Sequence, residues 1–136
     1  MSVHNSIMMT NRQGKTLSVQ INGPENAPAI VFSNSLGTDH GMWQPQVAAL
    51  KSQYRVVTYD TRGHGQSDVI ENTTLQNLGE DVIDILDALN IEKAHFCGIS
   101  MGGMTALWLG IYQPTRFYSI TAVSYTHLTL PTKRIV

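Results

Sequence analysis

The sequence predicts an α/β domain built on a mostly parallel sheet. Two features indicate this fold class. Short apolar runs alternate with stretches of helical periodicity after two leading strands, and the pentapeptide Gly98–Gly102, of the form Gly-x-Ser-x-Gly, stands between such a run and such a stretch. The chain has 136 residues, of which 42% are hydrophobic, and a formal net charge of −1. These values are ordinary for a globular protein.

The first half of the chain is expected to form a hairpin followed by alternating strands and helices. Residues 6–10 and 16–21 flank the turn-forming residues 11–15, which predicts a β-hairpin. The run 29–32 is entirely apolar, as in a central parallel strand. The other elements expected here are a turn at 22–26, a loop at 33–41, a helix at 42–52, a strand at 54–59 and a tight loop at 60–68.

The second half continues this alternation. Apolar residues at helical spacing, with acidic residues on the opposite side, predict an amphipathic helix that packs on the sheet. Its apolar positions are Leu78, Val82, Ile85, Leu86 and Leu89. A buried strand at 94–97, a helix at 103–109 and a strand at 118–123 are expected to follow.

Ser100, at the centre of the pentapeptide, is the predicted nucleophile. A serine at a strand-to-helix corner is held on a sharp turn that pushes its hydroxyl out of the sheet edge. Glycine at positions 98 and 102 tolerates the close approach of strand and helix. The N-terminus of the following helix points at the place where an oxyanion would develop. The alternative interpretation is an ordinary glycine-rich turn.

A nucleophilic serine also needs donors for the tetrahedral oxyanion. The backbone N–H of Met101, directly after the nucleophile, is the first expected donor. The second should come from the loop 33–37, where alignment with the usual oxyanion loop of α/β hydrolases gives Leu36. A shift of one residue, to Ser35, is the alternative.

The sequence offers no suitable base. In α/β hydrolases the acid and then the histidine follow the serine, and the only histidine after Ser100 is His127, in a segment interpreted below as foreign. The chain as it stands is therefore expected to be a poor enzyme. Other roles are assigned to the remaining polar candidates. His64 lies in a glycine-rich loop, His95 lies in a strand, and His4 and His40 are isolated and expected to be exposed. Asp60 and Asp68 are expected to hold their loop by short-range hydrogen bonds, and Cys97 is interpreted as a buried small hydrophobe rather than a second nucleophile.

The last residues do not fit the alternating pattern. Residues 123–132 resemble one reading frame of a widely used transposase sequencing adaptor, so 123–136 is interpreted as a non-native tail. Residues 1–122 are then the N-terminal portion of the domain, which stops after the strand that follows the helix expected at 103–109. A genuine short C-terminal strand is the alternative.

Charge and composition exclude several other classes. The near-neutral charge and the lack of a basic run give no reason to expect nucleic acid or an acidic membrane surface as partner. No apolar stretch is long enough for a membrane span, and no secretory signal is visible. A single cysteine fits a reducing cytoplasm. No cluster of histidine, cysteine or carboxylate residues has metal-ligand spacing.

Three motifs resemble the 3-oxoadipate enol-lactonases, which are α/β hydrolases. They are Phe32–Asp39 with Met42–Trp43, Tyr59–Ser67, and His95–Gly103. The resemblance covers essentially residues 1–122, and the Ser33–Gly37 loop is its most discriminating part. It implies a cofactor-free cytoplasmic serine hydrolase of the α/β-hydrolase fold, acting in aromatic-acid breakdown, that opens the enol-lactone of 3-oxoadipate to the keto-diacid.

The resemblance also implies a mechanism and leaves alternatives open. Ser100 would attack the lactone carbonyl while the N–H groups of Leu36 and Met101 hold the oxyanion. Ser35 and Trp43 are candidate substrate-pocket residues, although Trp43 could equally staple its helix. Arg62 could grip a substrate carboxylate on charge alone, with a structural role as the alternative. A broad carboxylesterase or perhydrolase, or a non-catalytic ligand-binding fragment, are the competing functions.

Overall fold

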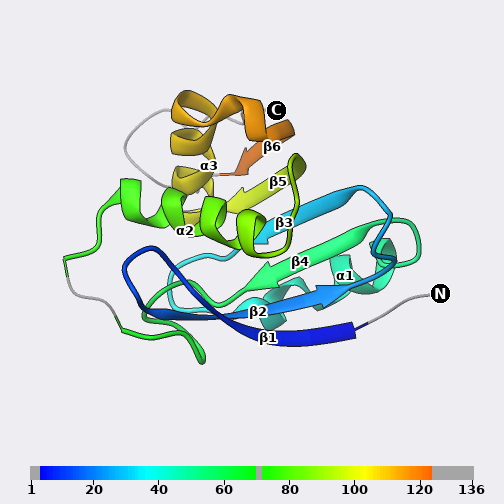
Figure 1. The fold of residues 1–136 in the computed structure, drawn as a ribbon, viewed down its shortest axis with the longest axis horizontal. Coiled ribbons are helices and arrows are strands. Elements are labelled where there is room, and N and C mark those ends of the chain that lie inside the picture. The colour runs from blue at the N-terminus through cyan, green and yellow to red at the C-terminus, as the bar shows by residue number, and fades with distance from the viewer. Residues whose placement is uncertain (1–3, 70–71, 124–136) are drawn as a thin grey trace.

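The computed structural model of the chain describes residues 4–69 and 72–123, which form one six-stranded sheet with helices on both faces (Figure 1). The sheet order is β1-β2-β4-β3-β5-β6. The strands are β1 (His4–Thr10), β2 (Thr16–Asn22), β3 (Ala29–Ser33), β4 (Arg55–Tyr59), β5 (Ala94–Ile99) and β6 (Phe117–Val123). The helices are the 3-10 helix η1 (His40–Trp43), α1 (Gln44–Leu50), α2 (Leu75–Ala88), α3 (Met101–Tyr112) and the 3-10 helix η2 (Pro114–Arg116).

The predicted α/β fold with a mostly parallel sheet is confirmed. β1 pairs antiparallel with β2, and β2 with β4, whereas β3, β4, β5 and β6 run parallel to one another. The expected helix at 42–52 differs in its first turn, which is the 3-10 helix η1 capped by the side chain of Asp39. Pro45 then stands in the first turn of α1, where its missing N–H costs nothing.

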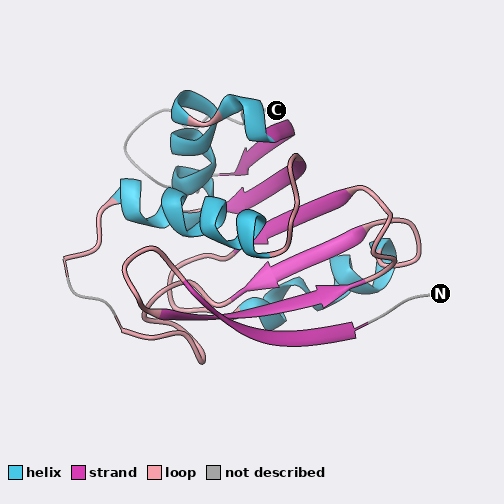
Figure 2. Cartoon of the chain, in the orientation of Figure 1, coloured by secondary structure: helices cyan, strands magenta, loops and turns pink. Residues whose placement is uncertain are grey.

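The two faces of the sheet carry separate cores. On one face α2 and α3 pack on the parallel strands, and α1 lies on the other face (Figure 2). Alternate residues of one strand serve both, because Val31 lies in the first core and Phe32 in the second. The amphipathic helix predicted from periodicity is α2, whose Val82, Ile85 and Leu86 are fully buried. Within the described residues no helix has the length and apolar character needed to cross a membrane.

A buried ion pair ties the loop after β4 to α2. Arg62 Nε and Nη2 donate to the two carboxylate oxygens of Asp81, each at 2.8 Å, and both side chains are almost wholly buried. Asn11 Nδ2 donates to Asp81 Oδ1 at 2.9 Å, and Arg62 Nη2 also donates to Gln13 Oε1 at 2.7 Å. Arg62 therefore has the structural role that the sequence offered as its alternative.

Candidate active site

Ser100 occupies the corner between β5 and α3, with φ 56° and ψ −113°. A positive φ is uncommon for a residue with a Cβ and marks stored backbone strain. The surrounding structure holds it there, since the Ser100 N–H donates to the Val123 carbonyl at 2.7 Å. The strand–turn–helix setting and the sharp turn predicted for a nucleophile elbow are both present.

The two flanking glycines are required by close packing. A Cβ on Gly98 would lie 2.0 Å from the carbonyl oxygen of Gly102, which is the first turn of α3. A Cβ on Gly102 would lie 2.3 Å from the carbonyl oxygen of Ser33. Backbone atoms are the obstacle in both cases, so no side chain could move aside. This is the physical reason for glycine at both ends of the pentapeptide.

The loop after β3 lies directly against the elbow. The Gly102 N–H donates to the Asn34 carbonyl at 3.1 Å, which fixes this loop to the start of α3. Leu36 follows with 71% of its surface exposed. Among the described residues, no acceptor is recorded for the backbone N–H of Leu36 or of Met101. The use of these two N–H groups as oxyanion donors, and the choice of Leu36 over Ser35, stay predictions.

Asn34 and Trp43 fix the base of the same loop. The fully buried Asn34 donates from Nδ2 to the Tyr59 carbonyl at 3.1 Å and accepts from Trp43 Nε1 at 2.8 Å. The Trp43 ring is 7% exposed and stacks on Phe32 with centroids 4.6 Å apart. These contacts give Trp43 the stapling role considered for it. Its role in a substrate pocket, and that of the buried Ser35, stay predictions.

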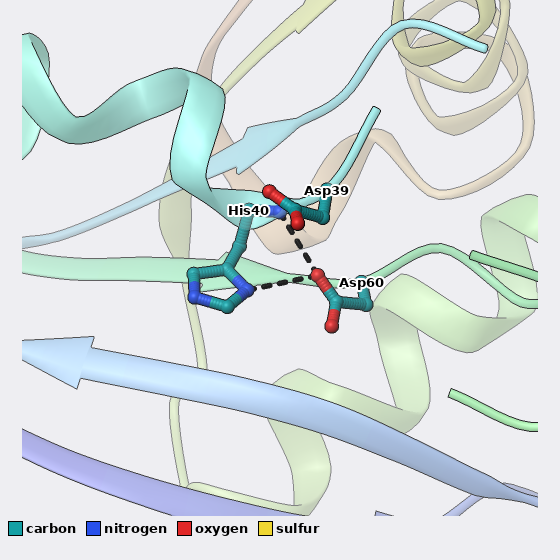
Figure 3. A group of neighbouring side chains, drawn as sticks. All are labelled: Asp39, His40 and Asp60. Atoms are coloured by element: carbon teal, nitrogen blue, oxygen red, sulfur yellow. Dashed lines mark hydrogen bonds and ion pairs between the residues drawn. The ribbon is translucent and has the colours of Figure 1, made fainter. Parts of the chain in front are cut away.

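Sequence reasoning missed a cluster formed by Asp39 and His40, at the start of η1, with Asp60, directly after β4 (Figure 3). His40 was expected to be isolated, and this is wrong. Its backbone N–H and its ring Nδ1 lie 2.9 Å and 2.8 Å from Asp60 Oδ1. The expectation that no such residues have metal-ligand spacing also fails, because their ligand atoms lie within 4.8 Å of one another. The cause is the parallel pairing of β3 and β4, which brings the loops after both strands together.

In this cluster the two carboxylates accept hydrogen bonds from backbone N–H groups and so hold the loops in place. Asp60 Oδ2 accepts from the Gln66 N–H at 3.0 Å, so both carboxylate oxygens already have N–H donors. Asp39 Oδ1 accepts from the Gly41 N–H at 2.8 Å and caps η1. Asp60 thus holds its own loop, as predicted. Asp68 does not act locally, because its Oδ2 accepts from the Thr16 N–H at 2.8 Å and ties the loop to β2.

The ionised form of Asp60 is expected to stabilise the fold. Burial opposes its charge, but hydrogen bonds from the Gln66 N–H, the His40 N–H and the His40 ring outweigh burial and keep the pKa of Asp60 below its usual value. In the unfolded chain the pKa of Asp60 is about 4. Because the pKa is lower in the folded protein, the ionised carboxylate stabilises the fold above this pH, and that stabilisation is lost as the pH falls through the folded-state pKa. We expect the unmodified chain to be more stable than Asp60→Asn at about pH 7, with the difference shrinking below about pH 4.

Urea unfolding at several pH values measures this difference. Glu25→Gln, at an exposed turn, is the matched control and should show no comparable advantage for the unmodified chain. An Asp60→Asn difference that stays constant from about pH 7 to about pH 3 would contradict the assignment, because a titrating carboxylate must lose its contribution in acid.

None of the described histidines is hydrogen-bonded to Ser100. His64 contacts Gly37 and Arg62, His40 contacts Asp60, and His95 Nδ1 lies 2.7 Å from Ser119 Oγ. His4 contacts Gln20. The remaining candidate, His127, lies outside the described residues, as does the rest of the suspected tail from residue 124 onward. Val123, counted with that tail, is the last residue of β6 and pairs with Ile99.

Cys97 is less buried than expected, being half-buried beside the α1-side core. Burial raises the pKa of its thiol, which disfavours the nucleophilic thiolate. Within the described residues the site therefore contains a strained serine at the start of α3, with Leu36 and Met101 N–H groups that have no recorded acceptor. That arrangement suits attack on a carbonyl carbon and stabilisation of the resulting oxyanion.

Comparison with known proteins finds relatives that are named as enol-lactonases. The chain is 91% identical over 124 residues to 3-oxoadipate enol-lactonase 1 of Acinetobacter baylyi, covering 91% of this chain and 47% of that protein. It is 50% identical over 99 residues to 3-oxoadipate enol-lactonase 2 of the same organism, covering 72% of this chain and 37% of that protein. The chain thus spans about half the length, or less, of these curated relatives.

A solved structure and a family model agree with the fold. The crystal structure of the enol-lactonase from Burkholderia xenovorans LB400 matches with a TM-score of 0.79 and 46% identity, over 82% of this chain and 44% of that one. The family model of the alpha/beta hydrolase fold matches residues 28–134. With its parallel sheet, its strained elbow serine and this match over most of its length, the chain belongs to the alpha/beta hydrolase fold family.

Proposed function

We propose that this chain provides the nucleophile and the oxyanion hole of a serine hydrolase that opens the enol-lactone of 3-oxoadipate. The observation that carries the reaction type is the strained Ser100 at the start of α3, with the unengaged N–H groups of Leu36 and Met101 nearby in the fold. The identity to the two Acinetobacter enol-lactonases supports the substrate. A small lactone is then the partner, and a cytoplasmic location fits the single free cysteine.

The proposed chemistry follows from these groups. Ser100 Oγ loses its proton to a base outside the described residues and bonds to the lactone carbonyl carbon. The carbonyl oxygen becomes an oxyanion that accepts from the N–H groups of Leu36 and Met101. Collapse of this intermediate breaks the ring C–O bond, and the enol that leaves becomes the ketone. Water then cleaves the acyl-enzyme and restores the serine. None of these steps calls on a metal or an organic cofactor.

The test uses a completed hydrolase. In this protein, residues 1–123 of this chain are followed by the C-terminal part of 3-oxoadipate enol-lactonase 1 of Acinetobacter baylyi that the chain does not cover. We expect its kcat/KM for the enol-lactone to exceed that for a simple phenyl ester on the order of 10²-fold or more, because a built site discriminates by the contacts it makes. The 136-residue chain alone should have a kcat/KM at least about 10³-fold lower than that of the completed hydrolase, since no described histidine is hydrogen-bonded to Ser100.

Equal or better turnover of the simple ester would instead identify a broad carboxylesterase. Peroxide-dependent oxidation at a higher rate than lactone opening would identify a perhydrolase. Either result would remove the substrate from the proposal while leaving Ser100 as the nucleophile. Absence of any hydrolysis by the completed hydrolase would remove the proposal itself.

A further inference from the structure

A histidine of the β4 loop contacts the oxyanion loop. The Gly37 N–H donates to His64 Nε2 at 2.9 Å, although the two residues belong to loops that follow different strands. Gly37 directly follows Leu36 and has φ 80°, within a turn closed by the Thr38 N–H on the Ser35 carbonyl at 3.4 Å. A φ of this sign at the third residue is the geometry of a type II turn, whose central peptide joins Leu36 to Gly37.

The direction of this hydrogen bond fixes the state of the histidine. A backbone N–H can only donate, so His64 Nε2 must be the acceptor and carry no proton. The ring is then neutral with its proton on Nδ1, which lies 3.1 Å from the Arg62 carbonyl and donates to it. Backbone bonds hold His64 itself, because its N–H donates to the Thr61 carbonyl at 2.8 Å and its carbonyl accepts from the Ser67 N–H at 3.0 Å.

Leu36 has few other anchors. Its side chain is 71% exposed, so packing contributes little to its position. On one side Asn34 is fixed to α3 through the Gly102 N–H, and on the other side Gly37 is fixed to His64. The Leu36 N–H lies in the same peptide as the Ser35 carbonyl, which accepts from the Thr38 N–H at 3.4 Å and from the Thr38 hydroxyl at 2.8 Å. Its direction is therefore set by this turn, and the hydrogen bonds at Asn34 and Gly37 fix the turn to α3 and to His64. An oxyanion donor must be aimed before the reaction, because a misdirected N–H stabilises the transition state less.

We propose that neutral His64 is a positioning residue that holds the oxyanion loop through the Gly37 N–H and so aims the Leu36 N–H at the reacting oxygen. This inference rests on the proposed function of Ser100. His64 does not touch the substrate. Its effect should appear in the rate of the chemical step rather than in substrate binding, since the oxyanion exists only in the transition state and the intermediate.

The first test compares His64→Leu with His64→Gln in the completed hydrolase. We expect His64→Leu to lower kcat by about 10- to 100-fold with KM changed less than about threefold, which is below the loss from deleting a donor outright. Glutamine carries an oxygen that can accept from Gly37, so it should restore kcat to within about threefold of the unmodified enzyme. His4→Leu, at an exposed position in β1, is the matched control and should leave kcat unchanged.

A kcat for His64→Leu within about twofold of the unmodified enzyme, or no recovery in His64→Gln, would overturn the proposal. A second measurement needs neither variants nor activity. In ¹⁵N NMR of the 136-residue chain, His64 should show an unprotonated Nε2 and a protonated Nδ1 at neutral pH. The opposite tautomer would also overturn it. Activity that survives Ser100→Ala would contradict the proposed function separately. The NMR result would still decide whether His64 Nε2 accepts from the Gly37 N–H.

Discussion

Replacing Ser100 with alanine should abolish lactone hydrolysis by the completed hydrolase, lowering kcat by about 10⁴- to 10⁶-fold. The acyl-enzyme cannot form without the hydroxyl, and the residual rate would come from the oxyanion hole alone. The fold should be preserved, since the contact that holds the corner is the Ser100 N–H on the Val123 carbonyl, and alanine keeps that N–H. Initial rates and a thermal unfolding curve of the same preparation measure both expectations.

The matched control is Ser52→Ala, an exposed serine in the turn after α1, which should retain full activity and stability. Activity of Ser100→Ala above about one part in a hundred would remove this residue from the mechanism. A large drop in the melting temperature of Ser100→Ala would mean that its inactivity reflects lost structure. His64→Leu should show neither this near-complete loss of activity nor a large drop in melting temperature, because it retains the nucleophile.

The second large effect concerns the free energy of unfolding. Asp81→Leu should destabilise the protein by about 3–5 kcal/mol, because it leaves the Arg62 guanidinium buried and without its carboxylate. Asn11 and Gln13 cannot compensate, since each makes only a single side-chain hydrogen bond to this pair. Replacing both partners, as in Arg62→Met with Asp81→Leu, should cost less than Asp81→Leu alone, since two apolar side chains need no counter-charge.

Urea denaturation of the single and double variants forms a double-mutant cycle. The control is Arg12→Met, which removes two ion pairs nearer the surface, those of Arg12 with Glu80 and Asp84 of the same helix α2 at 3.0 Å and 2.9 Å. Surface pairs contribute about 0–1 kcal/mol. If Asp81→Leu costs no more than Arg12→Met, or if the double variant is the least stable of all, the buried pair does not have the proposed role.

The elements of the fold and the nucleophile could be predicted because their signals are local. The apolar run 29–32 and the helical period of α2 each lie within one element, and the pentapeptide around Ser100 carries its own turn geometry. The first helix was expected to start at Met42, whereas α1 begins at Gln44, because Asp39 caps the 3-10 helix η1 that precedes it. Hydrophobic periodicity does not distinguish these two kinds of turn.

The missed contacts join residues far apart in the chain. His40 meets Asp60, His64 meets Gly37, and Arg62 meets Asp81, each across two different elements. Which loops become neighbours depends on the sheet order, and composition does not reveal it. One signal was available, since parallel strands end at the same sheet edge and the loops after both β3 and β4 are polar. The base for Ser100 could be inferred neither from the sequence nor from the described residues.

The strand order has a consequence for how the protein is made. β3 lies at the centre of the sheet, yet both of its neighbours, β4 and β5, are synthesised after it. On the ribosome, β3 must therefore wait for α1 to emerge before it can pair with β4, and for α2 before it can pair with β5. The β1–β2 hairpin, in contrast, forms from residues adjacent in the chain. The strain at Ser100 cannot be imposed until Val123 has left the exit tunnel, because that carbonyl accepts its N–H. The nucleophile corner can thus form only after β6 has been made.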